Sequence, residues 1–382
     1  MRAAANQQPR GGPAGDDAIR RAIEQMVGAR FPGARVVAAH PFGADEAFGD
    51  DEGDDDATAK AIGYGKPVAV RVALPDGSER RLVLHAAAPG AFGHERRADR
   101  AAEILLAYDS FDRIPGHVAA LDVGALTGDG RFLSLADTGE LYLLTSYAEG
   151  ELYAEELRAV ARRGQANERD VGHAALLGRY LASLHQPIDA PPSSYQRAIR
   201  DLVGDGQGIF GIVDSYPPTE PVATPARLEA YERLCLGWRW RLKPRSDRLR
   251  RTHGDFHPFN LVFDGDELAL LDTSRGSMGE PADDLAALAV NYPFFAIQHP
   301  GSWSAGLRPL YEAFFEAYFA ARHDDELLDV IAPFWAWRTL VVASPVWYPD
   351  LAADHRDRLL ALAEAVLAAP RFDLAMVERI FT

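Results

Sequence analysis

Residues 253–285 constrain the fold and the chemistry of this chain more than any other segment. They read His-Gly-Asp-Phe-His-Pro-Phe-Asn, then a short apolar run, then Leu-Leu-Asp-Thr-Ser-Arg. Two apolar runs, residues 261–263 and 268–271, flank Asp-Gly-Asp, which is typical of a β-hairpin with a tight turn. The sequence therefore predicts a hairpin that folds the end of its second strand back toward the start of its first.

This hairpin would bring three oxygen-bearing side chains together. Asp255 and Asn260 precede the first strand, and Asp272 follows the second. Carboxylate and amide oxygens are ligands that Mg2+ prefers, with phosphate oxygens and water completing the shell. Phosphoryl transfer of the kinase type needs one Asp to accept the proton of the attacking hydroxyl, and an Asn and a second Asp to hold metal. An ordinary Asp-rich surface turn explains Asp264 and Asp266, but it does not explain the other three side chains.

The same segment resembles the catalytic core of the aminoglycoside phosphotransferase and choline kinase-like enzymes. The resemblance rests on His-Gly-Asp with an Asn five residues after the Asp, on the later Leu-Asp, and on Gly-Glu-Pro-Ala-Asp-Asp-Leu-Ala at residues 279–286. It implies that Asp255 is the catalytic base and that Asn260 and Asp272 bind Mg2+. It also implies that His253 and Asp284 support the catalytic loop.

The resemblance further implies an α+β, two-lobed protein-kinase-like fold that uses ATP, with GTP not excluded. We expect a disordered N-terminus over residues 1–16 and a nucleotide-binding lobe with an antiparallel sheet over residues 17–147. A mainly helical catalytic and acceptor-binding lobe would follow over residues 148–382. Within it, the Pro- and Gly-rich residues 186–226 are too long for an ordinary connection, so we expect an insertion that caps the acceptor site.

Periodicity gives residues 67–146 of the first lobe the order strand, strand, helix, strand, strand, after a helix and a further strand. The expected elements are a helix over 17–31, strands over 34–39, 67–74 and 80–86, a helix over 92–108, and strands over 118–123 and 141–146. In the second lobe we expect helices over 172–185, 228–242, 304–322, 326–342 and 353–369, with His185 as a structural hydrogen-bonding residue.

One position departs from the family pattern. The strand over residues 80–86 should place a Lys on the nucleotide phosphates, paired with a Glu of the next helix, but this chain has His85 there. Either His85 contacts the phosphates, with Glu95 or Glu103 as the helix acid, or the register differs and His85 is an ordinary strand residue. Other cations that could replace the missing Lys are Lys60, Lys66 and Arg71.

The resemblance also suggests where adenine would bind. An apolar run at residues 141–144 leads into Glu-Gly at residues 149–150, as in the family's interlobe hinge. The backbone of Ser146, Tyr147 and Ala148 would then face the base. The alternative is a simple strand exit at Gly150.

Composition excludes several other classes of function. The net charge is −16, and eight acids within residues 45–56 supply half of it, so a broad nucleic-acid-binding surface is not expected. No apolar run approaches a membrane span, and residues 1–16 lack the apolar core of a secretory signal. The single cysteine, Cys235, cannot form an internal disulfide, which agrees with a cytoplasmic location. Nothing in the sequence indicates an oligomeric state.

Arg275 bears on the identity of the acceptor. Aminoglycoside-modifying members usually carry an aromatic residue and then an acid after the metal-binding Asp, whereas this chain has Thr-Ser-Arg. A guanidinium there would repel a polycationic drug unless it pairs with a carboxylate such as Glu280. Arg197 and Arg200 in the expected cap favour the same conclusion. We therefore expect a small neutral or anionic hydroxylated metabolite as the second substrate, bound together with the nucleotide.

Three alternatives stay open at this stage. A true aminoglycoside phosphotransferase is one, and a nucleotide-binding pseudokinase that acts as a regulatory scaffold is another, motivated by His85 in place of the Lys. Protein phosphorylation is less favoured, because the chain reaches Gly279 within seven residues of Asp272. That interval is short for a platform on which a peptide could dock.

Overall fold

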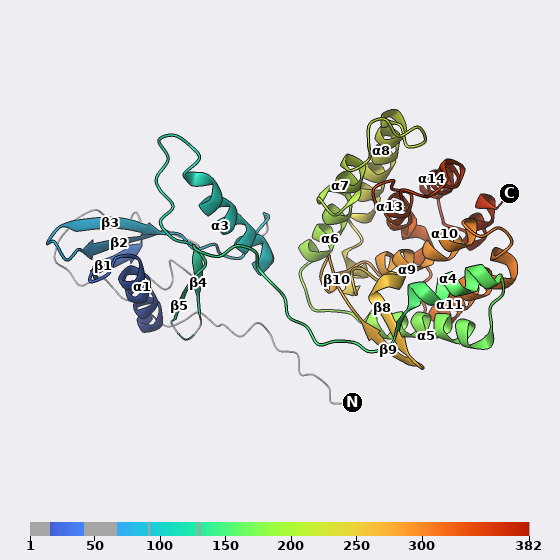
Figure 1. The fold of residues 1–382 in the computed structure, drawn as a ribbon, viewed down its shortest axis with the longest axis horizontal. Helices are drawn as coiled ribbons and strands as arrows, with labels where there is room; N and C mark the ends of the chain where they lie inside the picture. The colour runs from blue at the N-terminus through green and yellow to red at the C-terminus, as the bar shows by residue number, and fades with distance from the viewer. Residues whose placement is uncertain (1–15, 42–66, 91, 128, 130, 382) are drawn as a thin grey trace. The chain divides into compact units, whose positions relative to one another are not determined.

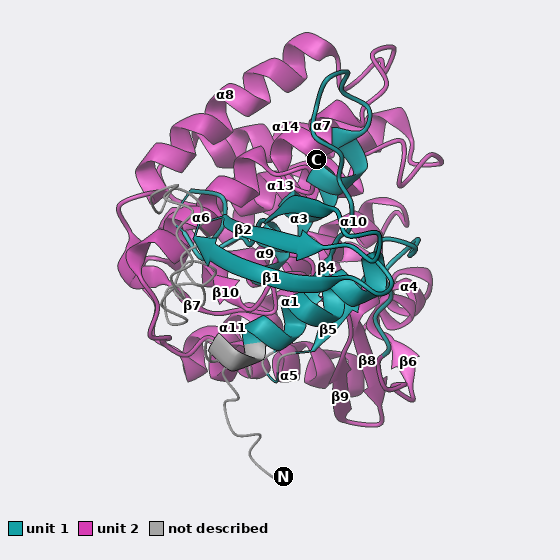
Figure 2. Cartoon of the chain, turned by 90° about the vertical axis from the view of Figure 1, so that its left-hand side faces the viewer, with its two compact units in different colours: residues 1–144 teal, residues 145–382 magenta. Residues whose placement is uncertain are grey.

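The computed structural model describes residues 16–41, 67–90, 92–127, 129 and 131–381. The chain forms two compact units, residues 1–144 and 145–382 (Figure 2), whereas the sequence-based boundary was placed after residue 147. The acidic segment 45–56, Lys60, Lys66 and nearly all of the expected disordered N-terminus lie outside the described residues. Of the helices that are described, none combines the length and the hydropathy needed to cross a membrane.

Unit 1 contains a three-stranded antiparallel sheet covered on one face by a helix (Figure 1). The helix is α1 (Asp16–Arg30), and the strands, in spatial order, are β1 (Arg35–Pro41), β2 (Val68–Ala73) and β3 (Glu79–Leu84). Alternation along β2 buries one set of side chains, and helical spacing along α1 buries the matching set. The resulting cluster is Ile19, Ile23, Val27, Val68, Val70 and Val72. The expected first three strands are therefore confirmed.

The later part of unit 1 differs from the sequence-based expectation. It contains α3 (Arg97–Phe111) and a small hairpin of β4 (Gly124–Leu126) and β5 (Phe132–Ser134). Residues 118–123 and 141–146 are not strands, so those two predictions were wrong. Apolar runs form strands only where a partner strand supplies the ladder, and none of the described strands pairs with either segment.

Unit 2 is mainly helical (Figure 1). Its strands are β6 (Glu151–Leu152), β7 (Arg250–Arg251), β8 (Leu261–Asp264), β9 (Glu267–Leu270) and β10 (Met278–Gly279). Its α-helices are α4 (Tyr153–Arg163), α5 (Glu168–Leu184), α6 (Pro192–Gly204), α7 (Ile209–Asp214), α8 (Pro225–Leu242), α9 (Pro281–Ala289), α10 (Asn291–Ile297), α11 (Arg308–Ala321), α12 (Leu327–Val330), α13 (Ala332–Val342) and α14 (Ala353–Ala368). Shorter helical turns are η1 (Ser246–Arg248), η2 (Pro258–Asn260), η3 (Trp303–Leu307) and η4 (Leu374–Ile380).

The core of unit 2 is organised around the crossing of α5 and α11. At Gly178 on α5, an added Cβ would lie 2.2 Å from the carbonyl oxygen of Phe314 on α11. Only a glycine permits this approach, which lets the two helix backbones pack closely. Phe314 and its neighbours Phe315 and Tyr318 are fully buried.

The predicted hairpin is present as β8 and β9. Leu261 pairs with Leu270 and Asp264 with Glu267, so the two-residue loop is Gly265-Asp266, and Gly265 adopts the positive φ of +58° that such loops require. Beyond the ladder, the Leu271 N–H donates to the Asn260 carbonyl at 2.9 Å. The hairpin therefore holds the residue before its first strand next to the residue after its second.

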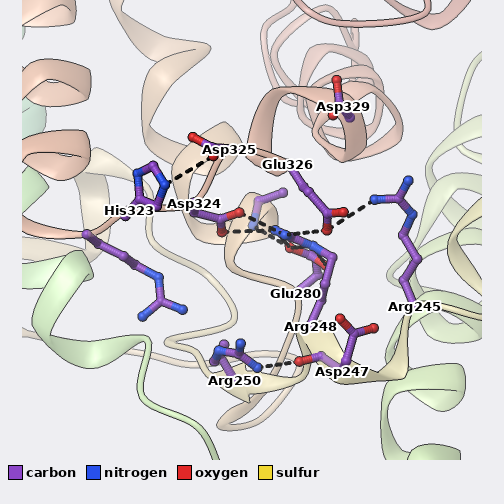
Figure 3. Close-up of polar contacts among 12 residues, drawn as sticks. Arg245, Asp247, Arg248, Arg250, Glu280, His323, Asp324, Asp325, Glu326 and Asp329 are labelled. Carbon is purple, nitrogen blue, oxygen red and sulfur yellow. Dashed lines mark hydrogen bonds and ion pairs between the residues drawn. The ribbon is translucent and has the colours of Figure 1, made fainter.

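A buried ion-pair network joins four separate elements of unit 2 (Figure 3). Arg248 of η1 binds Glu280 at 2.7 Å and Asp324 at 2.8 Å, and Tyr195 of α6 donates a hydrogen bond to Glu280 at 2.8 Å. Burial acts to lower the pKa of Arg248, but the charges of Glu280 and Asp324 and their hydrogen bonds outweigh it and raise that pKa. The guanidinium is therefore permanently charged, and both carboxylates depend on it.

We expect Arg248→Met to lower the free energy of unfolding by about 3 to 5 kcal/mol, because it leaves two buried carboxylates without a counterion. Urea denaturation followed by circular dichroism measures this loss. Arg233→Met is the matched control, since Arg233 bonds Glu229 on the exposed surface of α8. An equal loss in the two variants would contradict the structural role of the network.

Candidate functional site

The loop between β7 and β8 has one backbone position that only glycine can occupy. Gly254 has a φ of +82°, and an added Cβ there would lie 2.5 Å from the carbonyl oxygen of Gly276. The hydroxyl of Thr273 also donates to the carbonyl of His253. The His-Gly-Asp turn is therefore closed against the segment that follows β9.

Asp284 holds this loop from the first turn of α9. Its carboxylate is fully buried and accepts the backbone N–H groups of His253 at 2.7 Å and Gly254 at 2.9 Å. His185 donates from Nε2 at 3.2 Å, and the hydroxyl of Tyr318 lies 2.9 Å from its Nδ1. Burial acts to raise the pKa of Asp284, but the hydrogen bond and charge of His185 and the backbone donors hold that pKa below its ordinary value. The carboxylate is thus ionised and fixed.

Asp255 follows this turn, and its two carboxylate oxygens have different partners. Arg338 of α13 donates from Nη2 to Oδ1 at 2.7 Å. Oδ2 accepts from Asn260 Nδ2 at 3.3 Å and lies 3.6 Å from His257 Nε2. Burial acts to raise the pKa of Asp255, but the nearby imidazole of His257 and the charge of Arg338 hold that pKa well below its usual range.

Asn260 is oriented by the donors of its amide. Nδ2 donates to the backbone carbonyl of Asp255 at 3.0 Å, to its carboxylate, and to the backbone carbonyl of Asp272 at 3.3 Å. These bonds leave the amide oxygen available as a ligand. The hairpin thus brings Asp255, Asn260 and Asp272 together as the sequence predicted.

These side chains have the chemistry that Mg2+ requires. The carboxylate of Asp272 is exposed, and the structure shows it making neither a hydrogen bond nor an ion pair with any described residue. With the Asn260 oxygen it offers a set of hard oxygen ligands. In the described ranges, no group of three or more His, Cys, Asp or Glu side chains could hold a metal alone. An ion at this place would therefore depend on phosphate oxygens and water.

Arg275 does not pair with Glu280, the partner that the sequence suggested. Its guanidinium binds Asp283 through Nη2 at 2.7 Å and through Nε at 3.1 Å. The guanidinium carbons of Arg275 and Arg338 lie 4.0 and 3.8 Å from the centre of the Trp337 ring. Glu280 is only 1% exposed and is occupied by Arg248. The carboxylate that pairs with Arg275 is Asp283 instead of Glu280, because Asp283 lies on the face of α9 that Arg275 reaches.

The two arginines proposed for the cap share one acidic partner. Arg197 and Arg200 both contact Asp201, at 2.9 and 3.5 Å, and the side chain of Arg197 is only 12% exposed. They lie on α6, and the segment 186–226, which the sequence predicted to be an insertion over the acceptor site, contains the whole of α6 and α7. Tyr195 of α6 donates a hydrogen bond to Glu280. This bond holds α6 next to the chain segment that leads from β10 into α9.

The residues expected to bind nucleotide are divided between the two units. In unit 1, His85 directly follows β3 and Glu95 precedes α3. Arg71 on β2 pairs with Glu79 at 3.8 Å, and Glu103 on α3 pairs with His94 at 2.9 Å. In unit 2, Ser146 and Tyr147 are exposed and Ala148 is half-buried. Their joint role stays a prediction.

Sequence reasoning missed four side chains that line the site: His257, Asp283, Trp337 and Arg338. Arg338 lies 83 residues beyond Asp255, so no local motif connects them. A signal existed, however, because Arg338 is the one charge within the apolar run of α13. A buried arginine requires a carboxylate partner, which could have directed the search toward Asp255.

Comparison with known proteins gives one family and several distant structures. A model of the phosphotransferase enzyme family matches residues 70–334. A comparison with curated proteins gives no match.

Three solved structures illustrate the distant similarities. A choline/ethanolamine kinase family protein from Mesorhizobium loti is 18% identical over 60% of this chain and 70% of its own, with a TM-score of 0.35. A glucosamine kinase in complex with glucosamine, ADP and inorganic phosphate is 17% identical over 56% of this chain and 58% of its own, with a TM-score of 0.38. A macrolide 2'-phosphotransferase type I is 17% identical over 90% of this chain and 95% of its own, with a TM-score of 0.26.

The family match takes in the His-Gly-Asp loop, the β8–β9 hairpin and α9. It confirms the resemblance, the α+β protein-kinase-like fold class and the enzyme class of phosphotransferase that the sequence indicated. Trp337 and Arg338 lie beyond the matched residues. Because the match covers well over half of its length, the chain belongs to the phosphotransferase enzyme family.

Proposed function

We propose that this protein is an ATP-dependent small-molecule kinase that transfers the γ-phosphoryl group to a substrate hydroxyl. The observation that carries the proposal is the half-buried carboxylate of Asp255, fixed by Arg338 at 2.7 Å and hydrogen-bonded to the amide of Asn260, which also bonds the backbone of Asp272. A fixed carboxylate next to a set of hard-cation ligands is the arrangement that phosphoryl transfer to an alcohol needs. Membership of the phosphotransferase family supports this reading.

Asp255 orients the attacking hydroxyl and receives its proton. Because Arg338 and His257 keep its pKa low, Asp255 is a weak base and takes up the proton late, as the oxygen bonds to phosphorus. The rate enhancement then comes mainly from positioning. Asn260 and Asp272 would hold Mg2+, which, when bound, neutralises charge on the nucleotide phosphates.

The nucleotide assignments rest on the family pattern. We propose that Ser146, Tyr147 and Ala148 receive the base and that His85 and Glu95 act at the phosphates, with ATP as the donor and GTP as the alternative. The rival function is a nucleotide-binding pseudokinase, favoured by the absence of a Lys at residue 85. Against it stand Asp255, Asn260 and Asp272, which the fold keeps together.

For the acceptor, we propose a neutral or anionic hydroxylated metabolite rather than an aminoglycoside. Asp283 neutralises Arg275, so simple charge repulsion of a polyamine is weaker than the sequence suggested. The discrimination rests instead on Arg275 and Arg338, which pair with Asp283 and Asp255 and so occupy both of these carboxylates. A screen of sugars, amino alcohols, nucleosides and aminoglycosides for acceptor-dependent ADP release tests this. Efficient turnover of kanamycin-like compounds, unchanged in Arg275→Ala, would refute it.

The base assignment predicts that Asp255→Asn lowers single-turnover phosphoryl transfer by about 10²- to 10⁴-fold, because the hydroxyl loses its proton acceptor. Asp264→Asn is the matched control, since Asp264 is an exposed carboxylate of the same hairpin. Wild-type turnover in Asp255→Asn would show that the base is misassigned.

The metal assignment predicts that Asp272→Ala abolishes the Mg2+ dependence of both ATP binding and ATP consumption. Thermal shift with ATP, with and without Mg2+, measures the binding, and ADP release measures consumption. ATP binding that needs no metal, with no ATP consumption in the unaltered protein, would instead support the pseudokinase.

The low pKa of Asp255 also predicts a pH effect. In the unaltered protein Asp255 stays ionised as the pH falls, so activity should persist into the acid range. Arg338→Met removes a positive charge and leaves the burial, so the pKa of Asp255 should rise and the acid limb of the kcat/KM profile should move to higher pH. Arg338→Lys retains the charge and should shift the limb less. A profile that is unchanged in Arg338→Met would mean that Arg338 does not set the ionisation of Asp255.

A further inference from the structure

Three unpartnered N–H donors belong to the indole of Trp337 and to the two guanidinium groups that contact its ring. They are Nη1 of Arg275, Nε1 of Trp337 and Nε of Arg338, each buried and without a hydrogen-bond acceptor among the described residues. Trp337 is 5% exposed and Arg338 6% exposed. Folded proteins rarely bury such donors without an acceptor, because each one forfeits its hydrogen bond to water. Three of them at one ring indicate that an acceptor-bearing group belongs there.

The chemistry of these donors limits what that group can be. Guanidinium and indole groups donate hydrogen bonds and accept none. A hydroxyl placed among them would bring a proton of its own that none of these three donors can accept. Carboxylate and phosphate oxygens only accept, so an oxyanion satisfies all three donors.

The charge distribution points the same way. Burial and the charge of Arg275 lower the pKa of Arg338 to about 10, although Asp255 and Asp283 oppose the shift. Two guanidinium groups therefore lie close enough to destabilise each other even with both carboxylates in place. An additional anion beside the two guanidinium groups would relieve that repulsion.

The cluster also lies at the right place for a substrate group. Arg338 uses Nη2 to bind Asp255 and has Nε free on the same guanidinium. A ligand oxygen bound at Nε and the carboxylate of Asp255 would therefore both bind the same guanidinium group of Arg338. A molecule with its hydroxyl at Asp255 and its oxyanion at this cluster would carry the two groups only a few bonds apart.

We propose that Arg275, Trp337 and Arg338 form an oxyanion subsite for the acceptor, whose carboxylate or phosphate lies close to the hydroxyl that is phosphorylated. This inference rests on the proposed kinase function and narrows its substrate to hydroxy acids and phosphorylated alcohols. The donors place the oxyanion, and Asp255 places the hydroxyl.

The test compares acceptors that differ only in this group. With Mg2+ and ATP, ADP release is measured for glycerol, D-glycerate and sn-glycerol 3-phosphate, and for D-glucose, D-gluconate and D-glucose 6-phosphate. We expect kcat/KM to be at least about tenfold higher for a carboxylate or a phosphate member than for its neutral counterpart, as one hydrogen bond to a charged group implies. Within each series, the acceptor with the higher kcat/KM shows whether the subsite prefers a carboxylate or a phosphate.

Trp337→Phe tests the subsite directly, because it keeps a ring between the arginines and removes one donor. For the preferred oxyanion acceptor we expect KM to rise about tenfold with little change in kcat, and KM for the neutral counterpart to stay the same. Trp335→Phe is the matched control. It is the same substitution on the same helix, at a buried indole that also lacks an acceptor but packs against Phe372.

Thermal shift with D-glycerate and sn-glycerol 3-phosphate, against glycerol, covers the case in which none of the six compounds is turned over. A thermal shift with either anion that is lost in Trp337→Phe supports the subsite even without turnover. The missing turnover would then contradict the kinase function but not the subsite. Phosphorylation of neutral acceptors that requires Asp255 but shows no oxyanion preference leaves the kinase function standing and overturns the subsite. The absence of both turnover and stabilisation by any oxyanion also overturns it.

Discussion

The site depends on one buried carboxylate, that of Asp284, which accepts two consecutive backbone N–H groups from His253 and Gly254. Those N–H groups face inward because Gly254 takes a positive φ that other residues rarely adopt. The carboxylate stays ionised at the N-terminal turn of α9, where the helix dipole favours negative charge, and His185 and Tyr318 extend its hydrogen bonds into the α5–α11 core. The position of Asp255 is therefore set by the packing of the whole helical unit, not by its loop alone.

Around Asp255, positive and negative side chains alternate. Arg338 pairs with Asp255 and Arg275 with Asp283, and both guanidinium groups contact Trp337. Each pair offsets part of the cost of burying its members, and removal of one member would leave the other charge uncompensated. The four charges sum to zero, yet unpartnered donors remain and unpartnered carboxylates do not. Selectivity at such a site follows from hydrogen-bonding capacity more than from net charge.

Local sequence carried enough information for the loop and the hairpin, because their determinants are short-range: a glycine, two apolar runs and a two-residue turn. It failed where the determinant lay elsewhere in the chain. The apolar residues 141–146 have strand-like composition but no described partner strand, and Arg275 has two acids within reach, Glu280 and Asp283. Only the packing of η1, which commits Glu280 to Arg248, decides between those acids. The contact between Arg338 and Asp255 could not be predicted for the same reason, since the two residues are 83 positions apart in the sequence.

The pairing of Asp255 with Arg338 also bears on how the reaction proceeds. A carboxylate whose pKa is held low cannot remove a proton from an alcohol before bond formation, because the proton would be far more stable on the alcohol. Once the oxygen has begun to bond to phosphorus, the alcohol becomes acidic and even a weak base suffices. A loose transition state of this kind places little demand on the base and much on alignment. In the proposed mechanism, Arg338 therefore lowers the strength of Asp255 as a base while fixing its direction, and for phosphoryl transfer the second effect is the more valuable one.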